Sequence, residues 1–158
     1  MSSKILKSII SQDEIRNKEN KRTKLFLNIL RKEAFYGGGL FSLVKLLLFD
    51  KYSVEISAKT QIGAGLRLPH LHDIVISKNS TIGSNCTIFH QVTIGVNEMN
   101  SVEDAPQIGD NVYIGAGAKI IGGIVIGNDC VVGANAVVTK DIPENTIVTG
   151  YNYMRSKV

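Results

Sequence analysis

The chain has 158 residues, of which 44% are hydrophobic and 20% charged, with 15 glycines and no tryptophan. This length predicts one domain, and the composition excludes a largely disordered chain. The formal net charge is +4, but residues 1–52 carry 11 Lys and Arg against 5 Asp and Glu, whereas the remainder carries 7 against 9. No nucleic-acid-binding motif accompanies this basic excess, so we expect no nucleic-acid partner.

Two stretches near the N-terminus predict helices. Residues 4–15 and 24–36 mix apolar and charged side chains at spacings compatible with helices, and three glycines at 37–39 end the second one. The basic residues concentrate between Arg16 and Lys32. They form either a solvated helix face or a contact for an anionic partner such as acidic lipid.

Residues 40–49 predict a third, mostly apolar helix. Lys45 interrupts this stretch, which is much shorter than the ~20 residues that span a bilayer. We expect the helix to close an open end of the remaining fold, with contact to a membrane interface as the alternative. Residues 1–10 lack a signal-peptide core. We therefore expect a cytoplasmic protein, which on the alternative lies peripherally at the inner face of the membrane.

A six-residue repeat organises the rest of the chain. An Ile, Leu or Val recurs every sixth residue, with one shift of two residues and one gap of 14. These positions are Ile56, Ile62, Leu68, Ile74, Ile76, Ile82, Ile88, Ile94, Ile108, Ile114, Ile120, Ile126, Val132 and Val138. A glycine often follows the aliphatic residue directly, and a small residue often lies four positions after it. A period of six fits neither an α-helix nor a simple alternating hairpin strand.

We interpret the repeat as a solenoid in which each hexapeptide forms one short side of a triangular coil. The aliphatic residues point inward and stack ~4.8 Å apart on successive coils. Asparagines such as Asn85 and Asn135 allow tight turns at the corners. Cys86 and Cys130 fall at small inward positions, so we expect them to fill the core rather than act as nucleophiles.

This pattern resembles the hexapeptide-repeat acyltransferases, whose fold is a left-handed parallel β-helix. The resemblance covers residues 53–150. It predicts an all-β solenoid that follows a short N-terminal helical cap, residues 1–52, and precedes a C-terminal tail, residues 151–158. It also implies a homotrimer with active sites between subunits.

The repeat is interrupted twice, and loops that leave a rigid scaffold often carry function. The count shifts within residues 68–76, and the polar residues 96–107 carry no repeat, which predicts an extruded loop. All three histidines, His70, His72 and His90, lie at or near the first interruption. His70 and His90 are separated by one 18-residue coil plus the two-residue shift. We therefore expect them on the same side of consecutive coils.

A metal site is the rival interpretation of these histidines. His70 and His72 would share one face of a strand, which permits chelation together with His90. The γ-class carbonic anhydrases are solenoids with three histidine ligands, two of them in an H-x4-H pair. This sequence lacks that spacing. We therefore expect no bound metal.

A narrower resemblance is to the serine acetyltransferase branch of the family. Its pattern, acid-Ile-x-x-x-Ala-x-Ile-Gly-x-Gly-x-x-Leu-x-His, corresponds to residues 55–70, with Thr60 in place of Ala and Glu55 in place of the usual Asp. The resemblance implies O-acetyl transfer from acetyl-CoA, with His70 as general base and Glu55 holding its imidazole. We expect His90 and His72 to bind the acceptor.

The same resemblance implies that acetyl-CoA binds in a groove between subunits. Ala116 and Ala134 match positions whose backbone contacts the CoA arm in the family, and Gly117 follows the first of them. Lys140 is the expected pyrophosphate contact, and a solvated turn lysine is the alternative. Residues 150–155 depart from the family ending Gly-x-Pro-Ala-Arg, which leaves the adenine contacts undefined.

Two departures bear on the acceptor. Serine acetyltransferases carry Arg-His before the Pro that follows the extruded loop, whereas residues 103–106 read Glu-Asp-Ala-Pro, and an acid there disfavours a carboxylate. The N-terminal region is also too short for the helical domain of those enzymes, so the chain looks more like the small O-acetyltransferases of capsule and exopolysaccharide synthesis. We therefore predict an acetyl-CoA-dependent O-acetyltransferase acting on a saccharide hydroxyl in polysaccharide biosynthesis. The alternative is a serine O-acetyltransferase of cysteine biosynthesis, and the second alternative is a non-catalytic β-helix scaffold or a metal-binding solenoid.

Overall fold

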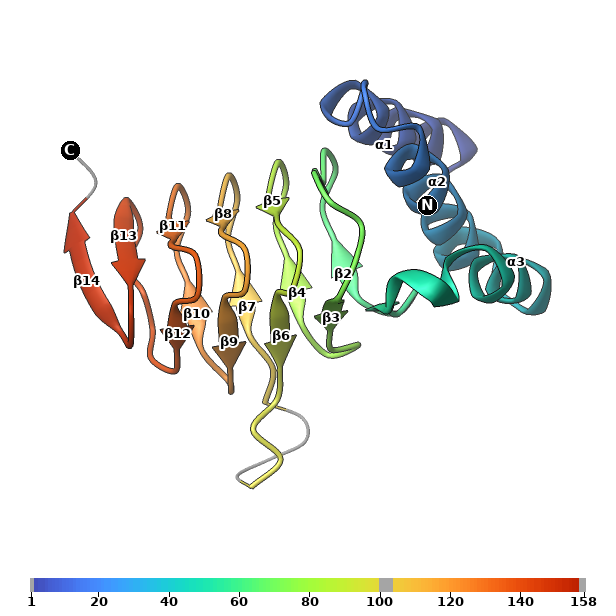
Figure 1. The fold of residues 1–158 in the computed structure, drawn as a ribbon. Helices are drawn as coiled ribbons and strands as arrows, with labels where there is room; N and C mark the ends of the chain where they lie inside the picture. Colours follow the sequence, from blue (N-terminus) through green and yellow to red (C-terminus); the bar gives the residue numbers. More distant parts are fainter. Residues whose placement is uncertain (1, 100–103, 157–158) are drawn as a thin grey trace.

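The computed structural model describes residues 2–99 and 104–156. Short strands wind into a left-handed β-helix, and three helices lie at its N-terminal end (Figure 1). The helices are α1 (Ser3–Arg16), α2 (Lys21–Tyr36) and α3 (Gly39–Phe49), followed by the 3-10 turn η1 (Asp50–Tyr52). The three predicted helices are therefore confirmed. α2 begins earlier than predicted because the Asn20 side chain caps it and accepts a hydrogen bond from the Thr23 N–H.

Three sheets form the three sides of the β-helix, which confirms the predicted fold class. The first sheet contains β1 (Val54–Ile56), β3 (Ile74–Ile76), β6 (Thr93–Gly95), β9 (Lys119–Ile121) and β12 (Val137–Val138). The second contains β2 (Gln61–Ile62), β4 (Thr81–Ile82), β7 (Gln107–Ile108) and β10 (Val125–Ile126). The third contains β5 (Thr87–Ile88), β8 (Tyr113–Ile114), β11 (Val131–Val132), β13 (Thr146–Thr149) and β14 (Tyr153–Ser156). Strands of successive coils pair in parallel, whereas β14 runs antiparallel to its neighbour, β13.

The repeated aliphatic residues build the core. All of them are buried except Ile62, which is half-buried and packs against the core. The strand register stacks equivalent residues, for example Ile82 of β4 between Ile62 of β2 and Ile108 of β7. Cys86 and Cys130 are fully buried, which confirms their predicted place in the core. Each buried aliphatic side chain stabilises the fold by ~1.5–3 kcal/mol, so the repeat itself supplies much of the driving force.

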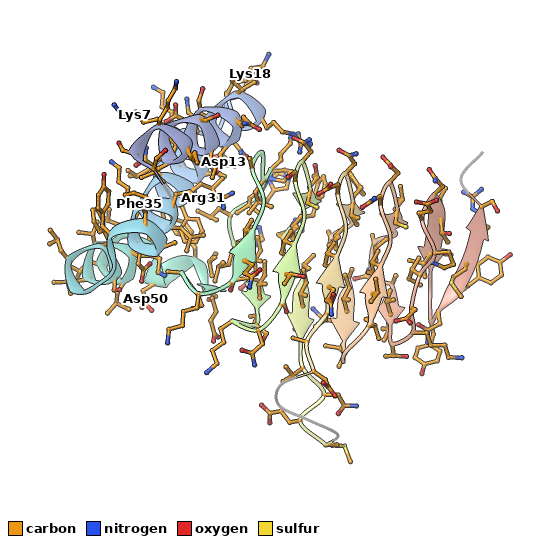
Figure 2. The ribbon with its side chains drawn as sticks, turned by 180° about the vertical axis from the view of Figure 1, so that it is seen from behind. Lys7, Asp13, Lys18, Arg31, Phe35 and Asp50 are labelled. Carbon is orange, nitrogen blue, oxygen red and sulfur yellow. The ribbon has the colours of Figure 1, made fainter. Side chains whose placement is uncertain are left out.

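Polar side chains of α1 and α2 close the open edge of the first coil. They donate to its backbone carbonyls: Arg31 to Ile62 and Gly63, Arg16 to Gly65, Asn17 to Leu66, Thr23 to Leu68 and Asn20 to Pro69. The carboxylate of Asp13 accepts from the Leu66 N–H and also pairs with Arg31, whose Nε lies 2.8 Å from Asp13 Oδ2 (Figure 2). Without these partners the edge would present unpaired backbone groups.

α3 contributes less to this closure than the sequence predicted. Only Phe49 of this helix is buried, whereas α2 buries Phe26, Leu27, Ile29 and Leu30. The leucines of α3 are exposed: Leu40, Leu43, Leu46, Leu47 and Leu48. The core at this end is already covered by the apolar side chains of α2 and, on α3, by Phe41, Val44 and Phe49. Across the part of the chain that the structure describes, no helix is long and apolar enough to cross a membrane.

The extruded loop and the C-terminal tail lie away from the helices (Figure 1). The predicted extruded loop, residues 96–107, leaves the β-helix between β6 and β7 (Figure 1), and β7 takes up its last residue. Within this loop, residues 100–103 lie outside the described residues. The predicted C-terminal tail contains β14, which folds back on β13. The division at residues 52 and 150 stays a prediction.

Candidate functional site

The three histidines lie at one corner of the β-helix, where the chain passes from the third sheet to the first. His70 and His72 lie in the turn that enters β3, and His90 lies in the equivalent turn between β5 and β6. We call this edge the histidine corner. On successive coils it comprises residues 69–73, 89–92, 115–118 and 133–136. The 20-residue separation of His70 and His90 predicted this shared position.

The imidazole rings of the corner contact one another. The ring centroids of His70 and His90 are 5.3 Å apart in an edge-to-face arrangement, and those of His72 and His90 are 4.7 Å apart. His90 Nδ1 is buried and has no hydrogen-bond partner among residues 2–99 and 104–156. Within these ranges, no group of three or more His, Cys, Asp or Glu is arranged to hold a metal ion. The cluster therefore brings together ring nitrogens suited to proton transfer.

The residues predicted to contact acetyl-CoA follow the histidines along the same corner. Ala116 and Gly117 lie one coil beyond His90, and Ala134 lies one coil further. The Gly117 N–H donates to the His90 carbonyl at 3.0 Å. The coils approach closely here, since a Cβ on Gly115 would lie 2.6 Å from the Ala134 nitrogen. One continuous backbone edge therefore runs from the imidazoles to Ala134.

Glu55 and Lys140 lie away from the histidine corner. Glu55 is exposed in the middle of β1, opposite Val75 of β3, and lines a groove on the first sheet. No hydrogen bond or ion pair joins Glu55 to His70, both of which the structure describes. Lys140 is exposed in the turn after β12, at the next corner of the coil. The structure thus places six of the predicted site residues along the histidine corner: His70, His72, His90, Ala116, Gly117 and Ala134. Glu55 and Lys140 lie elsewhere on the β-helix.

Sequence reasoning missed Asp73, the carboxylate that contacts an imidazole here. Asp73 Oδ2 lies 2.9 Å from His72 Nδ1, and both side chains are about half exposed. Asp73 adopts the left-handed conformation with φ of 53°, and its N–H donates to the Tyr52 carbonyl at 2.8 Å. The only signal in the sequence was its place directly after His72.

Arg16 connects α1 to the coils next to the histidine corner. Its guanidinium donates to the Gly65 carbonyl at 2.7 Å and to Thr87 Oγ1 at 3.2 Å. Burial, and secondarily the charge of Arg67, lowers the pKa of Arg16 from its ordinary value. Nearby, burial raises the pKa of the Cys86 thiol to about 11, so this cysteine stays protonated near neutral pH and is not a nucleophile.

Comparisons with known proteins match the β-helix. Residues 105–140 match a family model described as bacterial transferase hexapeptide (six repeats). The serine acetyltransferase of Mycobacterium tuberculosis is 42% identical over 97 residues, which cover 61% of this chain and 42% of that protein. The one from Helicobacter pylori is 39% identical over 97 residues, covering 61% of this chain and 57% of that protein. The chain therefore spans only about half the length of these curated relatives.

A solved structure extends the similarity to the helices. The soybean serine acetyltransferase apoenzyme matches with a TM-score of 0.79 and 30% sequence identity. The match covers 95% of this chain and 68% of the soybean chain. The N-terminal helices and the β-helix are thus arranged as in that protein.

These matches show that the prediction of a saccharide acceptor is wrong, because the relatives are serine acetyltransferases. The prediction rested on the acids at residues 103 and 104 and on the short N-terminal region. Residue 103 lies outside the described residues, and Asp104 is exposed beside Gly123, between the first and second sheets. Asp104 therefore occupies a different corner from His70 in the same chain. Its charge is a poor guide to what these histidines bind.

Proposed function

The chain belongs to the hexapeptide-repeat acyltransferase family, and from this premise we propose that it transfers the acetyl group of acetyl-CoA to the hydroxyl of L-serine. The observation that carries the proposal is the histidine corner, where three imidazoles meet beside a continuous backbone edge. The serine acetyltransferases that match this chain support both the donor and the acceptor.

His70 is the general base of the proposed reaction. It removes the proton of the serine hydroxyl as the oxygen attacks the thioester carbonyl carbon. The tetrahedral intermediate then collapses, and its carbon–sulfur bond breaks. The sulfur takes the proton from the imidazolium of His70, which gives O-acetylserine and CoA and regenerates the base.

The other residues of the corner serve binding. His72 and His90 position the acceptor against His70, and the backbone at Ala116, Gly117 and Ala134 receives the CoA arm. Two further assignments follow the family pattern alone. Glu55 orients the imidazole of His70, and Lys140 contacts the pyrophosphate.

We also propose that the protein forms a homotrimer in which neighbouring subunits border each CoA groove. Family resemblance supports this assembly. The arrangement would allow side chains from two subunits to complete one site.

A peripheral membrane contact is proposed for the leucine face of α3, which we define as Leu40, Leu43, Leu46, Leu47 and Leu48. Leu40 and Leu47 are 70% and 73% exposed. Lys45, the only charged residue of α3, turns away to pair with Glu33 at 2.7 Å. The basic excess of residues 1–52 favours an anionic lipid surface and disfavours a second copy with the same charge.

The test is release of the CoA thiol from acetyl-CoA in the presence of L-serine. We expect turnover by the natural chain and a ~10²- to 10⁴-fold lower kcat for His70→Asn. CoA binding and thermal unfolding of the variant should match those of the natural chain. A natural chain that is inactive with L-serine would refute the acceptor, and near-full activity of His70→Asn would refute the base.

A further inference from the structure

A groove separates the junction of α1 and α2 from the histidine corner. Residues 15–22 line one side of it, and Arg67, Pro69, His70 and Phe89 line the other. The groove has a volume of about 980 Å³ and therefore admits a small-molecule substrate. His70 is exposed at its wall.

The groove is strongly cationic. Its lining residues include five cations, Arg16, Lys18, Lys21, Arg22 and Arg67, and a single acid, Glu19. This concentration of one sign beside the proposed base would attract and hold an anion. Residues 16–22, the first part of the basic segment between residues 16 and 32, therefore line the groove beside His70.

Arg67 is the cation best placed to bind a ligand. The guanidinium of Arg16 is already engaged by the Gly65 carbonyl and Thr87, and that of Arg22 lies 4.6 Å from the ring centroid of Tyr52. The half-buried side chain of Arg67 makes no hydrogen bond or ion pair with any residue that the structure describes. Its charge instead acts unfavourably on Arg16. An anion between the groove walls would relieve this repulsion and give Arg67 a bidentate partner.

We propose that this groove is the subsite that binds the anionic group of a substrate, and that Arg67 is the main residue that binds this anion. The inference rests on the proposed function. The required chemistry is an oxyanion, which either the carboxylate of L-serine or a phosphate of acetyl-CoA supplies. If the anion is the carboxylate of L-serine, the groove would provide the positive charge that residues 103–106, Glu-Asp-Ala-Pro, do not provide.

The experiment compares Arg67→Gln with Arg67→Lys and with Lys59→Gln, which removes an exposed cation outside the groove. For each protein, KM is measured for L-serine at saturating acetyl-CoA and for acetyl-CoA at saturating L-serine. We expect Arg67→Gln to raise one KM by about tenfold or more with a smaller change in kcat, because a hydrogen bond to a charged group is lost. Arg67→Lys should be intermediate, and Lys59→Gln should leave both constants unchanged.

The two KM measurements, for L-serine and for acetyl-CoA, distinguish the source of the anion. A higher KM for L-serine, together with loss of the preference for L-serine over uncharged L-serinamide, identifies the carboxylate. A higher KM for acetyl-CoA identifies a phosphate. Unchanged values in both arms, with Arg67→Gln folded by circular dichroism, overturn the inference.

Failure of the proposed function is a separate outcome. If the natural chain does not acetylate L-serine, the groove is tested by calorimetric titration with CoA. Weaker binding by Arg67→Gln than by Lys59→Gln then supports the subsite. Equal binding by the two variants refutes it.

Discussion

His70, His72 and His90 all come from turns, and this explains how three polar rings gather on a chain whose repeat is aliphatic. Inward positions of the coils are filled by Ile, Leu, Val and small residues, so an imidazole can project only at a corner or from an outer face. The two-residue shift at residues 68–76 lengthens one turn and places two histidines in it. Chemistry at this site is therefore carried by corners and not by strands.

Glu55 lies on the first sheet, away from the histidine corner, and its proposed role gives the first prediction. If it orients His70, Glu55→Gln should lower kcat for acetyl transfer at least about tenfold, because the imidazolium loses its carboxylate. Glu98→Gln is the matched control, since Glu98 lines the same groove on the first sheet. Steady-state kinetics in which both variants retain the natural kcat would remove Glu55 from the mechanism.

Cys86 gives a prediction about pH. Burial raises its pKa from 9.0 to about 11 in the folded protein, so the folded state binds this proton more tightly than the unfolded state. The resulting stabilisation is present below pH 9 and is lost as pH rises towards 11. Denaturant unfolding at several pH values should show a steeper loss between pH 9 and 11 for the natural chain than for Cys86→Ala. Parallel curves would contradict this account.

At the scale of elements, α1 and α2 act as one polar cap on the first coil. The ion pair of Asp13 and Arg31 is buried, and each partner also bonds to the backbone of residues 62–66. Apolar side chains of α2 pack into the core beside these polar contacts. Both kinds of contact hold the helices on a solenoid edge that is only two residues wide in β2.

Removing one partner of this pair should destabilise the protein strongly. Arg31→Gln leaves Asp13 charged and buried, so we expect a loss of ~3–5 kcal/mol in unfolding free energy. Lys32→Gln, at the adjacent and less buried position of α2, should change it by less than ~0.5 kcal/mol. Chemical denaturation measures both variants, and equal stability would argue against an energetic role for the cap.

The leucine face of α3 gives the prediction for membrane contact. Replacing Leu43 and Leu47 together by Glu should reduce co-sedimentation with vesicles containing acidic phospholipid at least about tenfold, because two apolar side chains are lost and two negative charges gained. The control is Leu25→Glu, an exposed leucine of α2. Unaltered vesicle binding by the double variant would contradict a lipid partner. A change in its molar mass would assign the face to contacts between copies.

At the scale of the whole molecule, the β-helix aligns turns that are far apart in the sequence. The turns that hold His70, His90, Ala116 and Ala134 form one edge because each coil adds one turn to the histidine corner. A groove that runs along such an edge can extend across a neighbouring subunit. The proposed trimer rests on the family resemblance, and this edge is where neighbouring subunits would meet.

Light scattering tests the assembly. We expect a molar mass of three times the 17.2 kDa of one chain at micromolar concentration. A mass of one chain, from a preparation that is active with acetyl-CoA, would show that a single subunit holds a complete site. That outcome would contradict the shared groove.

The sequence by itself determined the solenoid, its inward positions and the position of His70 and His90 on consecutive coils. It did so because a six-residue period maps each residue to one place on a triangular coil, so local spacing is enough. It did not determine the acceptor, which was assigned wrongly from the charges of a short loop segment and the length of the N-terminal region.

Only the tertiary structure decided how the first coil is closed, which carboxylate contacts an imidazole, and that Arg67 faces residues 15–22 across a groove. The closure of the first coil and the groove at Arg67 join segments about 50 residues apart through side-chain hydrogen bonds, burial and charge. The contact between Asp73 and His72 joins neighbouring residues of one turn. No repeat or local propensity encodes such pairings. The leucines of α3 show the same limit, because α2 together with Phe41, Val44 and Phe49 of α3 already covers the core at the end that the whole apolar helix was expected to close.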